Sequence, residues 1–201
     1  MLDGMLKRRL DPLLAGLAIG LHRSGICPNT VTGVGLVLGL AAALAIALGH
    51  FWMGLTLILV SRLCDGLDGA LARLRQPTDL GGYLDIVFDY IFYGAIPLGF
   101  ALADPTSNAL PAAVLLMSFY ANGASFLGFA IIAAKRGLST DARGPKSLYF
   151  TTGLAEASET LLVFALACVF PAWFAALAYG FAALCVVTTA SRIALAVRLF
   201  R

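Results

Sequence analysis

Four aspartates in an otherwise apolar part of the chain are the residues best suited to chemistry. Asp65 and Asp68 are three residues apart, and Asp85 and Asp89 are four apart, so each pair lies on one face if the segment is helical. Four neighbouring carboxylates repel one another and should not all be ionised there without cations. Carboxylate oxygens favour hard ions such as Mg²⁺ or Mn²⁺ over zinc. The spacing therefore predicts a site for two divalent ions, an arrangement common in phosphoryl chemistry.

Glycines and an arginine at helical spacing from these aspartates suit a phosphate-containing ligand. Gly69 lies four residues after Asp65, Arg73 lies four after Gly69, and Gly81 lies four before Asp85. Glycine leaves room for a ligand against the backbone, and a guanidinium can pair with phosphate through two hydrogen bonds. The alternative is a structural ion-pair cluster between the aspartates and nearby arginines, Arg62, Arg73 and Arg75.

The composition indicates that membrane helices position these groups. Hydrophobic residues make up 60% of the 201 residues and charged residues 12%, and the mean hydropathy is +0.90. A water-soluble domain carries about 25% charged residues. Several apolar stretches reach the roughly 20 residues that cross a bilayer as a helix. We expect an all-α, polytopic membrane protein with a single domain over residues 1–201.

The apolar stretches and the breaks between them predict six membrane-spanning helices in a bundle over residues 31–199. Their approximate ranges are 31–48, 54–73, 81–102, 112–133, 149–169 and 172–195. Residues 104–108 are expected to form a polar loop. The apolar run within residues 1–23 is too short to span, so this segment is expected to be an amphipathic helix lying at the membrane interface.

The distribution of basic residues predicts the orientation in the membrane. Six spans place both termini on one side, together with the second–third and fourth–fifth loops, where Lys and Arg residues gather. The three opposite loops contain no Lys or Arg. The excess of positive charge marks the cytoplasmic side, so both termini and the aspartates are expected to be cytoplasmic.

The segments 65–73 and 81–89 resemble the signature of the CDP-alcohol phosphotransferase (phosphatidyltransferase) family. That signature is D-x-x-D-G-x-x-A-R, a spacer of seven or eight residues, and G-x-x-x-D-x-x-x-D. Every fixed position matches, and the spacer, residues 74–80, has the shorter length. The resemblance extends over the chain, because family members have about six spans with the motif across the second and third.

The resemblance implies a reaction and a set of residue roles. A CDP-linked lipid such as CDP-diacylglycerol would donate a substituted phosphate to the hydroxyl of an acceptor alcohol, and CMP would be released. Two ions, Mg²⁺ or Mn²⁺, would be bound by Asp65, Asp68, Asp85 and Asp89, and Asp89 would also be the general base. The CDP moiety would contact Gly69, Arg73 and Gly81. The similarity is to bacterial inner-membrane members of the family.

Two further residues and two further regions are candidate contacts with the substrates. Asn29 and Thr32, at the start of the first span, either reach the nucleotide or cap a helix. Glu156 and Glu159 suit hydroxyl groups or a cationic head, or form a structural polar network. A basic loop suits an acceptor phosphate or an anionic lipid, or simply marks the cytoplasmic side; its members are Lys135, Arg136, Arg143 and Lys146. We expect an anionic, glycerol-type acceptor such as glycerol phosphate.

The same residues are also compatible with two other functions. Intramembrane acids also suit a divalent-cation transporter or channel, and a family member could bind CDP-lipids without turnover. The expected partners are the donor, the acceptor and membrane lipid, with no nucleic acid. The small-residue pairs Gly16/Gly20 and Gly35/Gly39 permit close helix contacts, as in a homodimer.

Overall fold

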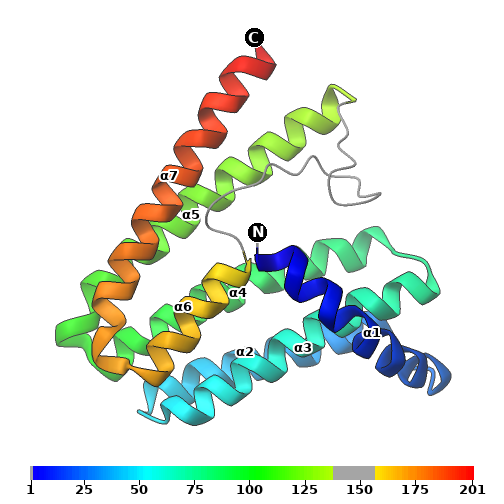
Figure 1. Cartoon of the computed structure of the whole chain (residues 1–201), viewed down its shortest axis with the longest axis horizontal. Helices are drawn as coiled ribbons and strands as arrows, with labels where there is room; N and C mark the ends of the chain where they lie inside the picture. The colour runs from blue at the N-terminus through cyan, green and yellow to red at the C-terminus, as the bar shows by residue number, and fades with distance from the viewer. Residues whose placement is uncertain (1, 138–156) are drawn as a thin grey trace.

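The computed structural model describes residues 2–137 and 157–201, and the side chains of residues 2–11 and 13 are not described. All regular structure in these residues is helical, with no strand. The helices are α1 (Leu2–Arg23), α2 (Pro28–Ala47), α3 (Phe51–Arg75), α4 (Asp79–Ala103), α5 (Pro105–Lys135), α6 (Ala157–Val169), the 3₁₀ turn η1 (Pro171–Trp173) and α7 (Phe174–Phe200) (Figure 1).

Four helical segments are long and apolar enough to cross a membrane: α2, α4, α5 and the continuous segment Pro171–Phe200. Helix α3 has 25 residues, the same length as α4, but Arg62, Asp65 and Asp68 interrupt its apolar run. Helix α6 is described over 13 residues. The chain is therefore an all-helical membrane protein, and the count of six spans stays a prediction. Helix α1 has the expected bounds, while its interfacial position also stays a prediction.

Small residues bring α2 close to both α3 and α4. A Cβ atom added to Gly35 would lie 3.2 Å from the Cβ of Cys64, and one added to Gly39 would lie 2.6 Å from the ring of Phe92. Gly35 and Gly39 are both buried. This pair therefore packs inside the chain, whereas Gly16 and Gly20 have open space where a side chain would be.

The largest apolar core contains residues from every helix from α2 through α7, and it is rich in aromatic rings. Phe100 of α4 stacks on Phe174 of α7, with ring centroids 4.5 Å apart, and on Phe51 of α3 at 5.9 Å. Phe92 of α4 meets Phe164 of α6 edge to face at 6.2 Å. Such pairs stabilise beyond the burial of their area, so these contacts fix α3 and α4 relative to the C-terminal helices.

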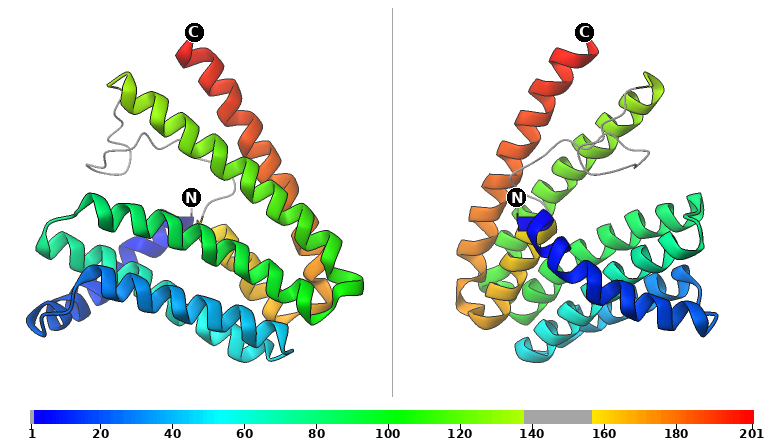
Figure 2. Two further views of the ribbon diagram at one scale, coloured as in Figure 1. Left: turned by 180° about the vertical axis from the view of Figure 1, so that it is seen from behind. Right: turned by 45° about the vertical axis from the view of Figure 1, so that its right-hand side comes forward.

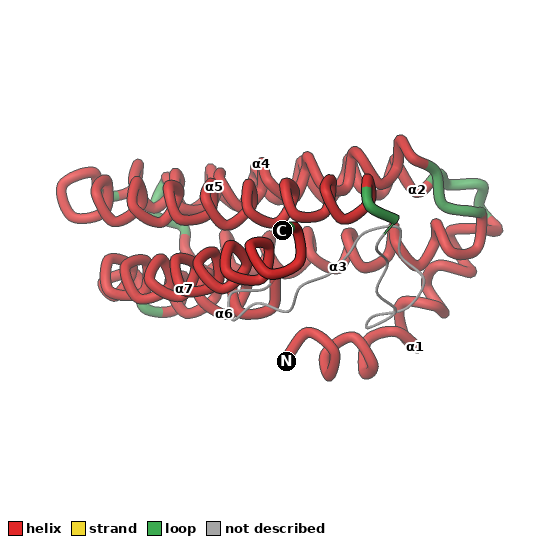
Figure 3. Tube along the Cα trace, turned by 90° about the horizontal axis from the view of Figure 1, so that it is seen from above, coloured by secondary structure: helices red, strands yellow, loops and turns green. Residues whose placement is uncertain are grey.

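Helices α5 and α7 pack together and lean away from the rest of the bundle toward the C-terminus (Figure 1, Figure 2). Seen from above, α5 lies over α4 and α7 over α6 (Figure 3). The turns α2–α3, α4–α5 and α6–α7 gather at one end of the molecule (Figure 1), and we call this the turn end.

The expected polar loop over residues 104–108 is wrong, because α5 begins at Pro105. The Asp104 side chain accepts a hydrogen bond of 3.1 Å from the backbone N–H of Ser107. Proline suits the first helical position, where its missing N–H costs no hydrogen bond. Asp104 and Pro105 therefore begin a helix, although both residue types are also common in loops.

Candidate metal centre

The aspartates reach a common site because α2 packs against both α3 and α4. A short link, residues 76–78, reverses the chain between them, and Thr78 caps α4 by accepting a 3.1 Å hydrogen bond from the N–H of Gly81. Helices α3 and α4 make most of their contacts with α2 and few with each other. The space between their facing side chains is therefore available to polar groups.

Three of the four predicted ligands come together directly. Asp65, Asp85 and Asp89 each offer a carboxylate oxygen, and these oxygens all lie within 4.8 Å of one another. Two oxygens on opposite sides of a single Mg²⁺ are about 4 Å apart. Small side-chain rotations would therefore let these three groups share one ion.

Asp68 lies beside this cluster and has a buried carboxylate oxygen that suits a cation. It is 6% exposed and lines a small cavity together with Asp65, Asp89 and Thr32. Within the described residues its Oδ2 atom is buried and has no hydrogen-bond partner. A buried carboxylate oxygen without a partner is costly, and a divalent ion would remove that cost. The residues present therefore fit a metal centre.

Among the described residues Arg62 contacts two carboxylates of the cluster, and the sequence identified it only as a member of an alternative ion-pair cluster. Its Nη1 lies 2.6 Å from Asp89 Oδ1 and 3.5 Å from Asp65 Oδ1. The guanidinium carbon also lies 4.0 Å from the centroid of the Phe92 ring. The sequence signal was an arginine three residues before Asp65 within an apolar helix.

The residues expected to contact CDP lie around the ends of the same helices. A Cβ added to Gly81 would lie 3.2 Å from Asn29 Oδ1, so the start of α2 meets the start of α4 where no side chain intervenes. A Cβ added to Gly69 would meet only Arg73 Nη1, at 3.8 Å. The capping alternative for Asn29 and Thr32 is wrong, because α2 has Cys27 at its N-cap and no side-chain cap.

The residues expected to contact the acceptor have different surroundings. Arg136 donates to the carbonyl oxygens of Leu199 at 3.1 Å and Phe200 at 2.6 Å, so it stabilises the C-terminal end of α7. Lys135 is exposed in the last turn of α5. Glu159 accepts a 3.0 Å hydrogen bond from the hydroxyl of Ser158. The remaining three, Arg143, Lys146 and Glu156, lie outside the described residues.

A buried arginine on α7, Arg192, was not among the candidate residues that the sequence pattern indicated. It is 7% exposed, and its Nη1 donates to Asn122 Oδ1 at 2.6 Å. Tyr90, which follows Asp89, reaches α5 so closely that a Cβ on Gly123 would clash with its ring. Tyr90 interacts electrostatically with both Arg192 and Asp89. The usable signal was an arginine inside a long apolar stretch, a functional candidate by default.

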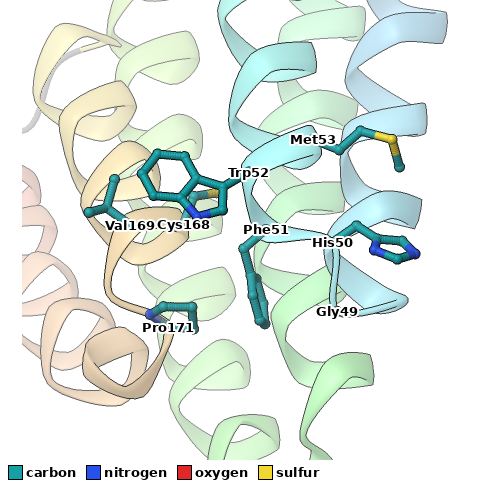
Figure 4. Close-up of a pocket in the computed structure, with 8 residues that line it drawn as sticks. All are labelled: Gly49, His50, Phe51, Trp52, Met53, Cys168, Val169 and Pro171. Atoms are coloured by element: carbon teal, nitrogen blue, oxygen red, sulfur yellow. The ribbon is translucent and has the colours of Figure 1, made fainter.

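A cavity without charged lining residues lies at the turn end of the molecule, away from the aspartates. It has a volume of about 420 Å³ and is lined by residues of the α2–α3 turn and of the α6–η1 junction, among them Trp52, Phe51 and Pro171 (Figure 4). No Asp, Glu, Lys or Arg lines it. The residues that line this cavity therefore offer no carboxylate, ammonium or guanidinium group for metal or phosphate binding.

Sequence comparisons connect the aspartate site to known proteins. The sequence profile described as CDP-alcohol phosphatidyltransferase matches residues 25–197. The chain is 48% identical to inner membrane protein YnjF of Escherichia coli over 193 residues, 96% of this chain and 94% of that protein. It is 37% identical over 102 residues to a phosphatidylinositol phosphate synthase of Mycobacteroides abscessus, covering 49% of this chain and 46% of that protein.

Comparison with solved structures gives a similar fold. The phosphatidylinositol phosphate synthase of Mycobacterium tuberculosis with bound CDP-DAG has a TM-score of 0.72 and 22% identity, over 90% of this chain and 92% of that one. The same enzyme with manganese and citrate has a TM-score of 0.73 and 24% identity, over 90% and 87%. At this level of identity the likeness concerns the fold.

Proposed function

The chain belongs to the CDP-alcohol phosphatidyltransferase family, and on that basis we propose that it transfers a phosphatidyl group from CDP-diacylglycerol to an anionic, glycerol-type alcohol. Enzymes of this family use a CDP-linked lipid donor, an alcohol acceptor and a divalent metal. The observation that carries the proposal is the convergence of Asp65, Asp85 and Asp89 beside the buried, unpartnered Oδ2 atom of Asp68.

The four aspartates are proposed to hold two ions, Mg²⁺ or Mn²⁺. Two ions would supply charge neutralisation for the diphosphate and for the departing CMP. Asp68, from within the cavity, and Asp85, from its exposed side, would approach the ions from different directions. Fixed charges in a half-buried site stabilise a developing phosphate charge more strongly than water does.

Asp89 is proposed to accept the proton of the acceptor hydroxyl. The acceptor oxygen then forms a bond to the phosphorus nearer the lipid, the bond from that phosphorus to the CMP oxygen breaks, and CMP leaves with the electron pair. Arg73 is proposed to pair with the nucleotide phosphate. Gly69, Gly81, Asn29 and Thr32 are proposed to form the surface against which cytidine lies, because Gly69 leaves room at the backbone and Gly81 lets the start of α4 approach Asn29.

An anionic acceptor is favoured by the buried charge on α7. Arg192 lies near Tyr90, the residue that follows Asp89, so a guanidinium lies close to the segment of α4 that carries the proposed base. A phosphate on the acceptor could pair with it. Lys135 remains a candidate for this site, whereas the bonds of Arg136 to Leu199 and Phe200 give that residue a structural role.

The proposed orientation places both termini and the aspartates in the cytoplasm, with α3 and α6 completing six spans and α1 lying at the interface. The described turns at the turn end, around residues 48–50, at Asp104 and at residues 170–173, contain no Lys or Arg. Basic residues instead occupy the opposite helix ends, for example Arg75, Lys135 and Arg198. Positive charge is retained on the cytoplasmic side.

The test is CMP release by the full-length protein in lipid nanodiscs supplied with CDP-diacylglycerol, Mn²⁺ or Mg²⁺ and a set of acceptors. We expect CMP only with an acceptor and a metal, with glycerol phosphate the best acceptor. Asp89→Asn should abolish release. Asp104→Asn is the matched control, because it makes the same substitution at the turn end and asparagine caps a helix about as well as aspartate.

Other outcomes would assign another function. Metal-dependent binding of CDP-diacylglycerol without CMP release for any acceptor would indicate a non-catalytic member. Metal flux across proteoliposomes without CDP-lipid binding would indicate a transporter. Preference for an uncharged or cationic acceptor would overturn the proposal of an anionic acceptor, while the proposed transfer reaction would stand.

A further inference from the structure

Arg62, a side chain of α3, brings a positive charge into the carboxylate cluster. Arg62 Nη1 contacts Asp89 at 2.6 Å and Asp65 at 3.5 Å, and these are two of the three groups positioned to share an ion. A Mg²⁺ or Mn²⁺ ion bound to the same Asp89 oxygen would stand about 2 Å from it. Two cations so close in a half-buried site repel strongly, so the guanidinium and an ion compete for this carboxylate.

The surroundings of Arg62 keep its guanidinium close to the site. Its side chain is 15% exposed, one face lies 4.0 Å from the Phe92 ring centroid, and Nη2 is 3.4 Å from Ser61 Oγ. Stacking on an aromatic ring stabilises a guanidinium where water is largely excluded. Neither the ring nor the hydroxyl contact involves Asp89, so both would keep the guanidinium beside the cavity if it released that carboxylate.

The hydrogen bonding of Arg62 is incomplete in its present position. Its Nε atom is buried and has no partner within the part of the chain that the structure describes. A buried donor without a partner carries a cost. The hydrogen bond from Nη1 to Asp89 partly offsets that cost.

We propose that Arg62 is a tethered counter-ion of the metal centre, which neutralises Asp89 and Asp65 when ions are absent and releases Asp89 when ions bind. The inference rests on the proposed function, in which these aspartates hold divalent ions. Its consequence is a limit on metal affinity. The apparent dissociation constant equals the intrinsic constant divided by the fraction of molecules in which Asp89 is released.

A purely structural ion pair would behave differently. It would stabilise the fold by the same amount with and without metal, and its loss would leave metal affinity unchanged or weaker. A tethered counter-ion stabilises only the metal-free protein, because in the metal-bound protein the ions take over its charge. The combination of affinity and stability therefore separates the two roles.

The experiment measures Mn²⁺ binding, from the electron paramagnetic resonance signal of free Mn²⁺, and thermal unfolding in chelator and in saturating Mn²⁺. It compares the wild-type chain, Arg62→Gln and Arg75→Gln in nanodiscs. Arg75 is the matched control, because it lies on the same helix and its Nε donates to His22 Nδ1 at 3.3 Å. We expect Arg62→Gln to bind Mn²⁺ about tenfold more tightly, the size of one lost charged hydrogen bond.

Arg62→Gln should also unfold several degrees below the wild type in chelator, and this difference should disappear in Mn²⁺. Arg75→Gln should change neither the affinity nor the metal dependence of unfolding. Unchanged or weaker Mn²⁺ binding by Arg62→Gln, or equal destabilisation with and without metal, would overturn the proposal. If Arg62→Gln does not fold, Arg62→Met serves instead, because methionine also removes the charge and keeps an unbranched side chain beside Phe92: tighter binding than wild type supports the proposal, and equal or weaker binding overturns it.

Failure of the two proposals can be told apart. If the wild-type chain itself binds no Mn²⁺, the proposed metal-dependent function fails. If the wild type binds Mn²⁺ and Arg62→Gln binds it no more tightly, only the role of Arg62 fails.

Discussion

Helices α3 and α4 each contribute to two regions with opposite physical character. Toward the turn end, Phe51 and Phe100 stack in a core that the described residues fill with apolar and aromatic side chains. Toward the other end, the same helices place carboxylates and arginines in contact. Phe92 stands at the boundary, since one ring contacts Phe164 and also lies under Arg62. The apolar region fixes the helices, and the charged region can then hold groups that repel one another.

The difference between the regions predicts different responses to mutation. In the charged region an altered side chain should change activity strongly and stability little, because the aspartates stabilise bound ions and substrate more than the fold. In the apolar region the order should reverse, because its side chains contribute packing and no chemistry.

The largest effect is expected for Asp89→Asn. Loss of the proposed base and of one ligand should reduce CMP release by at least about 10³-fold, which corresponds to roughly 4 kcal/mol of transition-state stabilisation. Thermal unfolding in chelator should change by only a few degrees. A rate within tenfold of wild type would show that Asp89 is not the base.

Phe100→Ala should produce the reverse pattern. Phe100 is 0% exposed, and the cavity left by its ring should lower the free energy of unfolding by about 3 kcal/mol. Activity per folded molecule, measured as CMP release below the melting temperature, should stay near the wild-type value. A strong loss of activity in fully folded protein would mean that the two regions are coupled more tightly than their separation indicates.

Gly81→Ala tests the edge of the charged region. Its new methyl group would stand 3.1 Å from Thr78 Oγ1 and 3.2 Å from Asn29 Oδ1, closer than most such contacts. We expect the KM for CDP-diacylglycerol to rise about tenfold, or roughly 1.4 kcal/mol, with a smaller change in kcat. Gly82→Ala, whose methyl group would meet nothing within 4 Å, is the control.

Arg136→Gln should have the smallest effect. It removes two exposed hydrogen bonds to the last carbonyls of α7, each contributing about 1 kcal/mol or less. The melting temperature should fall by a few degrees at most, and the KM for the acceptor should stay unchanged. A clear rise in that KM would return Arg136 to the acceptor site where the sequence analysis placed it.

The sequence predicted the structure best for features that depend on residues close together in the chain. The bounds of α1 and the short link between α3 and α4 follow from breaks in apolar periodicity and from helix-starting residues. The error at residues 104–108 has the same origin, since proline and aspartate are common both in loops and at helix starts. Side chains that meet across helices were harder to assign, and Arg136 is the clearest case.

The sequence by itself determined the family, the helical membrane class and the spacing that places Asp65 with Asp68 and Asp85 with Asp89. Helix periodicity is local, so residues three or four apart share a face whatever surrounds them. Only the tertiary structure decided that α2 lies against both α3 and α4, that Arg62 contacts Asp89 across 27 residues of chain, and that Arg192 lies buried beside Asn122. Those contacts depend on how closely whole helices approach, and that distance is set by small residues such as Gly35 and Gly39 together with their partners on other helices.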